Sequence, residues 1–294
     1  MLCYWLHWMH CFFAFRTQSP LPVTRLGTQR FVTSSLQAAE DAFARLANGP
    51  RSWSRLRHIA EMALSREHRT VADIGTDHGL LATGLAATGH FRSVIGVDVS
   101  ESALNEGARR VLAETDLHLS ESGKDRFPLE FRLGSGLSPL AVGDCDTVCI
   151  AGMGVNTMEQ ILLELTSDGT PLLDSLQCKA LLLQPTNTRP RNLIQLYDSL
   201  QKRNWYPRDE RVSYLSSRWY WNVAFERSEA SFGDRLLPGL TFSLDRSPSE
   251  QWALFLRYVD EHCRWLDEDQ RRSGLRGRED EWLQHFLPLL ADRQ

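Results

Sequence analysis

The stretch that most constrains this chain is Thr70–Leu80, which reads TVADIGTDHGL. Its first half is apolar and partly β-branched, which suits a buried parallel strand, although a run this short is also compatible with a helix. Two glycines then bracket Thr76, Asp77 and His78, and a helix-length apolar run follows. Strand, glycine turn and helix open a nucleotide-binding α/β unit, because glycines let a ligand approach the backbone and the helix start offers free N–H groups.

The charge of this turn favours a cationic ligand. Its glycines, Gly75 and Gly79, form the pattern GxxxG rather than the GxGxxG that holds a dinucleotide pyrophosphate. Asp77 in the turn and Asp73 near the strand end would repel a phosphate and attract a cation. S-adenosyl-L-methionine (SAM) has a sulfonium and an ammonium group and no phosphate, so the turn favours SAM over NAD. The alternative is a glycine turn that merely packs a helix on a sheet.

A second carboxylate supports a nucleoside ligand. Ser93–Val99 predicts the next strand, and Asp98 lies near its end, 23 positions after Gly75. This is the spacing at which a carboxylate binds a ribose diol. Both SAM and NAD contain that diol, so Asp98 indicates a nucleoside without distinguishing the two.

Further apolar runs complete a sheet. Three more strands are expected, each ending in glycine or polar residues that would meet at one edge of a parallel sheet. The strands are Leu129–Leu133, Asp146–Ala151 and Ala180–Leu183, followed by Gly134-Ser135-Gly136, Gly152-Met153-Gly154 and Gln184-Pro185. Arg211–Tyr214 and Trp219–Phe225 then predict a β-hairpin. We therefore expect an α/β fold with a Rossmann-like, doubly wound sheet closed by a hairpin.

Three regions divide the chain: a leader over residues 1–39, an α/β domain over residues 50–228, and a C-terminal part over residues 229–294. The C-terminal part begins with a Gly- and Pro-containing linker, and Ser249–Asp269 and Glu279–Ala291 then predict a pair of helices. Two interpretations of this pair remain open. It either packs on the α/β domain or projects as an arm that grips an extended substrate.

The leader contains arginines but no aspartate or glutamate, which is typical of an organellar transit peptide. We expect it to direct the chain to a plastid or mitochondrion. Its first 15 residues are strongly apolar but shorter than the ~20 residues that span a bilayer, so no stable membrane insertion of the mature protein is expected. The alternative is a disordered or wrongly predicted N-terminus.

Composition excludes few other classes of function. The formal net charge of −4 argues mildly against a large phosphate-binding surface, although a local arginine patch remains compatible with it. Cys145 and Cys149 have no second pair of ligands, so we expect no metal site and interpret both as small core residues.

Several motifs together resemble one family. RLRHIAEMAL, VADIGTDHGLL, GVDVS, RLGSGL, IAGMGV and LLLQPT occur in the order and approximate spacing of the bacterial tRNA adenine-22 N1-methyltransferase family. The resemblance runs from about Arg55 to the C-terminus. It implies a SAM-dependent methyltransferase of class I, with a Rossmann-like domain and a C-terminal helical, coiled-coil-like domain, which acts on adenosine in tRNA.

The resemblance also implies site residues. Asp73, Gly75, Asp77 and His78 would line the SAM site, Asp98 would hold the ribose, and Gly134–Gly136 would lie beside the adenine. Gly152, Met153 and Gly154 would border the methyl-transfer centre with Gln184 and Pro185. Two positions depart from the family pattern: Ser135 replaces an acidic residue, and Val155 replaces a glycine. A hydroxyl accepts a hydrogen bond from the adenine amino group more weakly than a carboxylate does.

The implied chemistry is transfer of the SAM methyl group to N1 of an adenine. Asp77 could stabilise the cationic methylated ring, and His78 could orient Asp77 or hydrogen-bond the base; alternatively, His78 only bonds the backbone of the turn. Two other functions remain open: a methyltransferase acting on a small molecule or protein, and a non-catalytic RNA-binding protein whose site has decayed at Ser135. A dehydrogenase is disfavoured because GxGxxG is missing.

Overall fold

The computed structural model describes residues 25–45, 49–109, 127–228, 236–244, 249–273 and 277–291. Its centre is a seven-stranded sheet in the order β3-β2-β1-β4-β5-β7-β6. The first five strands are parallel, and β7 runs antiparallel to both β5 and β6. The strands are β1 Thr70–Ile74, β2 Ser93–Asp98, β3 Leu129–Leu133, β4 Thr147–Met153, β5 Ala180–Pro185, β6 Trp205–Leu215 and β7 Arg218–Arg227. This topology confirms the expected Rossmann-like sheet closed by a hairpin.

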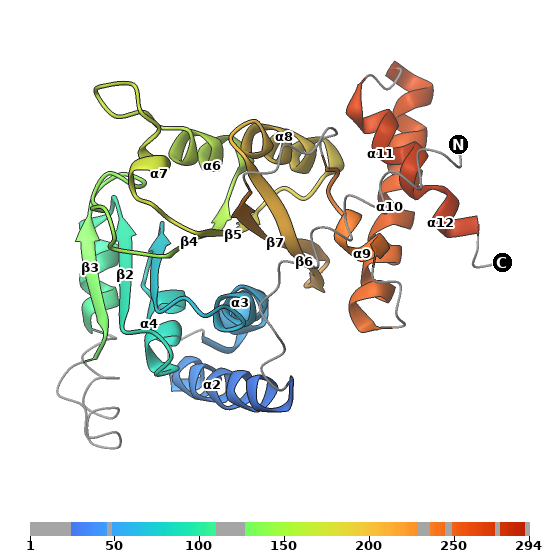
Figure 1. Ribbon diagram of the computed structural model, residues 1–294. Coiled ribbons are helices and arrows are strands. Elements are labelled where there is room, and N and C mark those ends of the chain that lie inside the picture. The colour runs from blue at the N-terminus through green and yellow to red at the C-terminus, as the bar shows by residue number, and fades with distance from the viewer. Residues whose placement is uncertain are drawn as a thin grey trace.

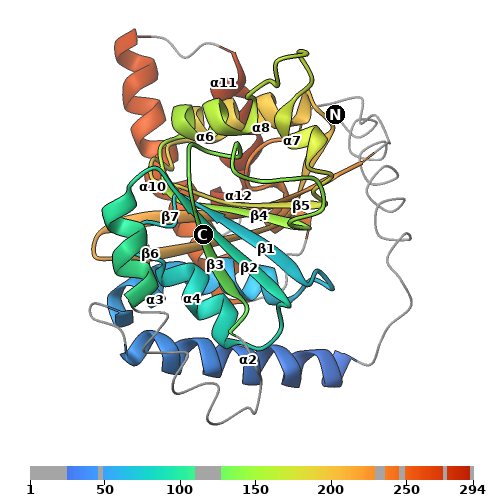
Figure 2. The same cartoon turned by 90° about the vertical axis from the view of Figure 1, so that its left-hand side faces the viewer.

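Helices cover both faces of the sheet (Figure 1). One face carries α3 (Gly49–Leu64) and α4 (Leu80–Ala87), and α2 (Arg25–Arg45) lies across the outside of both helices (Figure 2). The other face carries α6 (Val155–Leu162), α7 (Leu172–Ser175) and α8 (Pro190–Gln201). Successive residues of β5 point to opposite faces, so Leu182 joins the core beneath α3 while Leu181 and Leu183 join the other core. Burial on both faces explains why β1, β2, β4 and β5 are mostly apolar, whereas the edge strand β3 is only partly buried and contains Glu130 and Arg132.

The hairpin is longer than the sequence predicts. Its strands β6 and β7 pair from Trp205 and Arg227 to Leu215 and Arg218, and Ser216 and Ser217 form the turn with φ of 49° and 60°. The register shifts between Pro207 and Asp209. Proline has no N–H for the sheet, and the shift breaks the alternation of side chains, so the first half of β6 lacks a recognisable strand pattern.

The C-terminal helices pack on the sheet rather than projecting from it (Figure 1). They are α9 (Leu240–Leu244), α10 (Glu250–Ser273), α11 (Arg278–Phe286) and α12 (Pro288–Ala291), so the expected last helix is interrupted where Pro288 begins a new helix. Phe255, Tyr258 and Trp282 are fully buried in the same core as Trp221 of β7, and the Trp221 and Tyr258 rings lie 4.9 Å apart. Residues 236–244, interpreted from sequence as part of a linker, contribute Leu236 and other side chains to that core.

A buried carboxylate joins this helical layer to the sheet. Glu210 of β6 is 4% exposed and accepts hydrogen bonds from the Gly239 N–H at 2.8 Å, from the Thr241 N–H at 3.1 Å and from the Thr241 hydroxyl at 2.6 Å. The Tyr197 hydroxyl of α8 donates a fourth. Burial raises the pKa of Glu210, while these hydrogen bonds act in the opposite direction. One side chain therefore connects β6, α8 and the segment that leads to the C-terminal helices.

The N-terminal leader is described in part. Residues 1–24 lie outside the described residues, whereas residues 25–39 belong to α2, in which Ser35 and Ala39 are buried. This part of the expected leader thus packs on the α/β domain. None of the helices among the described residues is both long and apolar enough to cross a membrane.

We expect Glu210→Gln to destabilise the protein by about 2–4 kcal/mol, because an amide has one acceptor oxygen and would turn a donor toward the Thr241 N–H. Urea unfolding at pH 7 measures the change. The matched control is Glu40→Gln on the exposed surface of α2, for which we expect a change below about 0.5 kcal/mol. Equal stability of the two variants would show that Glu210 does not anchor the helical layer.

Candidate functional site

The turn after β1 is tied to the neighbouring strand. The N–H groups of Gly75 and Thr76 both donate to the Val97 carbonyl of β2, at 2.8 and 3.0 Å. Gly75 has a φ of 68°, and Asp77 has a φ of 54°, a left-handed conformation that aspartate tolerates better than most residues. The Asp77 side chain is consequently turned outward and is 73% exposed. The turn presents an exposed carboxylate at the carboxyl edge of the sheet.

Asp98 fixes two loops at this edge. One carboxylate oxygen accepts the Asp77 N–H and the other accepts the Ser100 N–H, both at 2.9 Å. A carboxylate has about four acceptor positions, so two remain for hydroxyl groups of a ligand. Asp98 is partly exposed, and Val99 beside it is 69% exposed. The arrangement suits a diol bound at the end of β2.

Asp73 lies beneath the turn rather than at its surface. It is 3% exposed, and its carboxylate accepts a hydrogen bond of 2.7 Å from the Thr76 hydroxyl. Burial raises the pKa of Asp73 to about 6, against the opposing effects of the Thr76 hydrogen bond and the Arg55 charge. Asp73 therefore shapes the turn from below.

His78 lies between two carboxylates. Its Nε2 is 3.5 Å from an Asp77 oxygen, and its Nδ1 is 3.1 Å from an oxygen of Glu106, on the helical residues 101–109. The ring thus lies beside both carboxylates. Glu106 is not recognisable from sequence because it resembles any polar residue on an exposed helix face.

The Met153 side chain at the end of β4 covers Gly75, which follows β1. A Cβ added to Gly75 would lie 1.9 Å from the Met153 Cε, so only glycine leaves room for that methyl group. Gly152 has a φ of 84° and faces Arg55 of α3, whose Nη1 would lie 3.0 Å from an added Cβ. Met153 thus lies beside the first turn, and Gly152 lies beside Arg55.

Ser135 lies in the loop after β3, and its side chain is exposed. The loop is held at the edge by the Gly134 N–H, which donates to the Asp98 carbonyl at 2.9 Å. The Ser135 carbonyl accepts the Ser138 hydroxyl at 2.7 Å. Ser135 directly follows Gly134 in this loop, at the position where the family pattern has a carboxylate.

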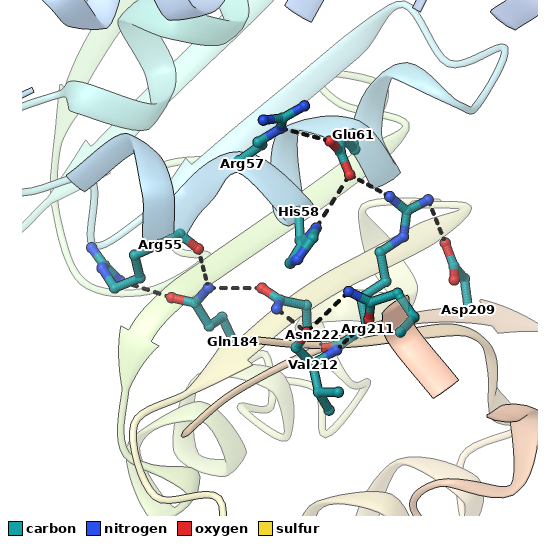
Figure 3. Close-up of polar contacts among 10 residues, drawn as sticks. Arg55, Arg57, His58, Glu61, Gln184, Asp209, Arg211, Val212 and Asn222 are labelled. Atoms are coloured by element: carbon teal, nitrogen blue, oxygen red, sulfur yellow. Dashed lines mark hydrogen bonds and ion pairs between the residues drawn. The ribbon is translucent and has the colours of Figure 1, made fainter. Parts of the chain in front are cut away.

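Gln184 is held by a polar cluster that sequence reasoning misses (Figure 3). Its oxygen accepts from Arg55 Nη1 at 2.8 Å, and its nitrogen donates to the Arg55 carbonyl at 2.8 Å and to Asn222 Oδ1 at 2.7 Å. Gln184 is 1% exposed. Arg55 precedes the first predicted strand on an amphipathic helix, so its spacing alone gives no sign of a place in the site.

A second polar cluster joins α3 to β6 beside the first (Figure 3). Glu61 accepts from Arg211 Nη1 at 2.5 Å and from Arg57 Nε at 2.9 Å, and it lies 3.2 Å from His58 Nδ1. Partial burial alone would raise the pKa of Glu61, but hydrogen bonds from His58 and Arg57 and the charge of Arg211 lower it to about 2. These contacts hold α3, and with it Arg55, against the hairpin.

The residues at this edge fit a nucleoside that carries a positive charge. Asp77 and Asp98 concentrate negative charge there, and Asp98 retains acceptor positions for a diol. The Met153 methyl group fills the space beside Gly75, and the Arg55 guanidinium lies beside Gly152. The arrangement satisfies the requirements of SAM better than those of a dinucleotide.

Comparisons with known proteins agree with this fold. The family described as "Methyltransferase domain" matches residues 53–221, more than half of the chain. No curated protein sequence matches the chain. Among solved structures, the Bacillus subtilis m1A22 tRNA methyltransferase TrmK has a TM-score of 0.54 and 22% identity, and the match covers 81% of this chain and 94% of that one.

Three further structures are similar over the same share of this chain. Sp1610 of Streptococcus pneumoniae, a candidate tRNA (m1A22) methyltransferase, has a TM-score of 0.56 and 21% identity, with 95% of its chain covered. A second structure of Sp1610 contains S-adenosyl-L-methionine. Mycoplasma capricolum TrmK, with S-adenosyl-homocysteine, has a TM-score of 0.50 and 16% identity, with 93% covered. At these identities the likeness establishes the fold.

We expect the ion pairs of Glu61 to make stability depend on acidic pH. Because the folded pKa of about 2 is below the ordinary value of 4.5, the stabilisation is complete above about pH 4.5 and is lost as pH falls toward 2. At pH 7, Glu61→Gln should be less stable by about 1–2 kcal/mol, after allowance for solvent screening. Thermal unfolding of the wild-type protein and of Glu61→Gln from pH 7 to pH 2 should show their difference in stability shrinking. A difference that stays constant over this range would contradict the role of the Glu61 ion pairs.

Proposed function

Because the chain belongs to the methyltransferase domain family, we propose that it transfers the methyl group of SAM to N1 of an adenine in tRNA. The observation that carries this proposal is the edge formed by Asp77, Asp98, Gly75 and Gly152, which suits a cationic nucleoside. The similar structures support the substrate class, because TrmK of B. subtilis is an m1A22 tRNA methyltransferase and the likeness extends beyond the family domain.

Residues of this chain would hold SAM along the sheet edge. Asp98 would accept hydrogen bonds from the ribose hydroxyls, Ser135 would lie beside the adenine, and the backbone at Gly75 and Gly152 would border the amino-acid portion. When bound, SAM supplies a methyl group that its positively charged sulfur already activates. The protein then contributes mainly alignment, with the Met153 methyl group limiting the space between the two turns.

The target atom needs no base to activate it. Adenine N1 has an in-plane lone pair, so a bond from N1 to the methyl carbon forms as the carbon–sulfur bond breaks, and the sulfur leaves as a neutral thioether. The positive charge passes to the adenine ring. Asp77 is exposed at the edge and oriented by His78, and its carboxylate would stabilise that charge. N1 lies on the Watson–Crick edge, so a paired target must be unpaired or flipped first.

We also propose that the residues before α2 direct the protein to an organelle, either a plastid or a mitochondrion. Support comes from the absence of acidic residues before Glu40. Because Ser35 and Ala39 are buried on α2, cleavage ahead of Arg25 would leave the packed helix intact. A fluorescent protein fused to residues 1–24 should accumulate in that organelle. Uniform distribution of the fusion through the cell would refute the targeting role.

The function is tested with the full-length chain, labelled SAM and unmodified organellar and bacterial tRNA. We expect N1-methyladenosine at a single tRNA position. Asp77→Asn should reduce kcat by about 10- to 1,000-fold, because it removes a charge near the reacting base. Asparagine is preferred to alanine there because it tolerates the φ of 54°.

Other outcomes of this experiment lead to different conclusions. SAM binding without transfer to tRNA would indicate a small-molecule or protein substrate. Absence of SAM binding would overturn the proposed activity and favour an RNA-binding protein whose site has decayed at Ser135. Full activity of Asp77→Asn would remove the electrostatic role of Asp77. The matched control is Asp41→Asn, an exposed carboxylate on α2 away from the sheet edge, which should retain wild-type activity.

A further inference from the structure

Arg55 is a partly buried cation without a carboxylate partner. Among the described residues, Gln184 is the single hydrogen-bond partner of its guanidinium, and no carboxylate oxygen lies within 4.0 Å of it. Burial lowers the pKa of Arg55, although Tyr220, Asp73 and Asp77 act in the opposite direction from farther away. Two neighbouring arginines are paired: Arg57 of α3 and Arg211 of β6 both contact Glu61. A guanidinium has five N–H donors, so Arg55 retains donors for a ligand.

Gln184 holds Arg55 and has no donor left for a substrate. Both protons of its amide nitrogen are used, one by the Arg55 carbonyl and one by Asn222 Oδ1. Asn222 is itself fixed, because its Nδ2 donates to the Arg211 carbonyl at 3.3 Å. Figure 3 shows the Gln184 amide between the Arg55 side chain and Asn222. Gln184 therefore acts as a positioning residue, and the guanidinium of Arg55 is the group it positions.

The guanidinium lies at the carboxyl edge of the sheet. Its Nη1 would be 3.0 Å from a Cβ on Gly152, and Gly152 directly precedes the methionine that covers Gly75. Arg55 thus sits beside the two turns that would border the transferred methyl group. A cation with unused N–H donors at this point can bind an anionic group of a ligand.

We propose that Arg55 binds an oxyanion of a ligand in the methyl-transfer site, held in place for this purpose by Gln184 and Asn222. This inference rests on the proposed function, in which two such groups reach the edge: the α-carboxylate of SAM and a phosphate of the RNA. Both are oxyanions that a guanidinium can bind with two parallel hydrogen bonds.

Binding and kinetic measurements on Arg55→Gln test this proposal and distinguish the two sources. S-Adenosyl-L-homocysteine carries the carboxylate, whereas 5′-deoxy-5′-methylthioadenosine has the nucleoside without the amino-acid portion. If the carboxylate is bound, Arg55→Gln should weaken S-adenosyl-L-homocysteine about 10- to 100-fold and leave 5′-deoxy-5′-methylthioadenosine unchanged. If a phosphate is bound, affinity for both small molecules should stay constant, KM for tRNA should rise, and the salt dependence of tRNA binding should become shallower.

Arg92→Gln is the matched control, because Arg92 is exposed and directly precedes β2, at the opposite end of that strand from Asp98. It should change neither small-molecule affinity nor KM for tRNA. If Arg55→Gln fails to fold, Arg55→Lys takes its place, because lysine keeps the positive charge but not the bidentate geometry. It should show a smaller loss of affinity for whichever of the two ligands Arg55 binds. Wild-type affinities and wild-type KM in the Arg55 variants would overturn the oxyanion role. Failure of the wild-type protein to bind S-adenosyl-L-homocysteine would overturn the proposed function itself.

Discussion

The carbonyl of Val97 accepts the N–H groups of both Gly75 and Thr76, and the rest of the site depends on this double hydrogen bond. It ends β1 by turning the chain toward β2, where Asp98 receives the next free N–H, that of Asp77. The left-handed backbone at Gly75 and Asp77 follows from this path, and it directs the Asp77 carboxylate outward. The carboxylates of Asp77 and Asp98 then both lie at this turn, where they can attract a cationic nucleoside.

The other half of the site depends on helix α3. This helix precedes the sheet in the chain but crosses β4 and β5 and reaches the hairpin, to which Glu61 and Arg211 attach it. Gln184 and Asn222 then connect α3 to the edge of β5 and to β7. The strands that carry the reacting centre and the hairpin that closes the sheet are therefore bound to the same helix. Such contacts between distant parts of the chain supply rigidity that a turn of small residues lacks.

Sequence patterns predicted the sheet and its functional edge because the apolar strands are bounded by glycine and polar residues. The orientation of individual side chains could not be predicted from these patterns. The strand β1 is buried on both faces, so its pattern could not show that Asp73 points inward to Thr76. Arg55, Glu106 and Asn222 were missed because single polar residues on helices and strands resemble solvated surface. Their partners lie 129, 28 and 38 positions away along the chain, beyond any local pattern.

The shared core at the C-terminus affects how this protein can change during evolution. Trp221 of β7 packs against Phe242, Phe255 and Tyr258, all of which follow the α/β domain in sequence. Asn222, the next residue, holds Gln184 at the opposite face of the same strand. A lineage that lost or exchanged its C-terminal helices would expose a tryptophan adjacent to the residue that supports the reacting centre. The helical region is thus inherited together with the site and is poorly suited to replacement as an independent module.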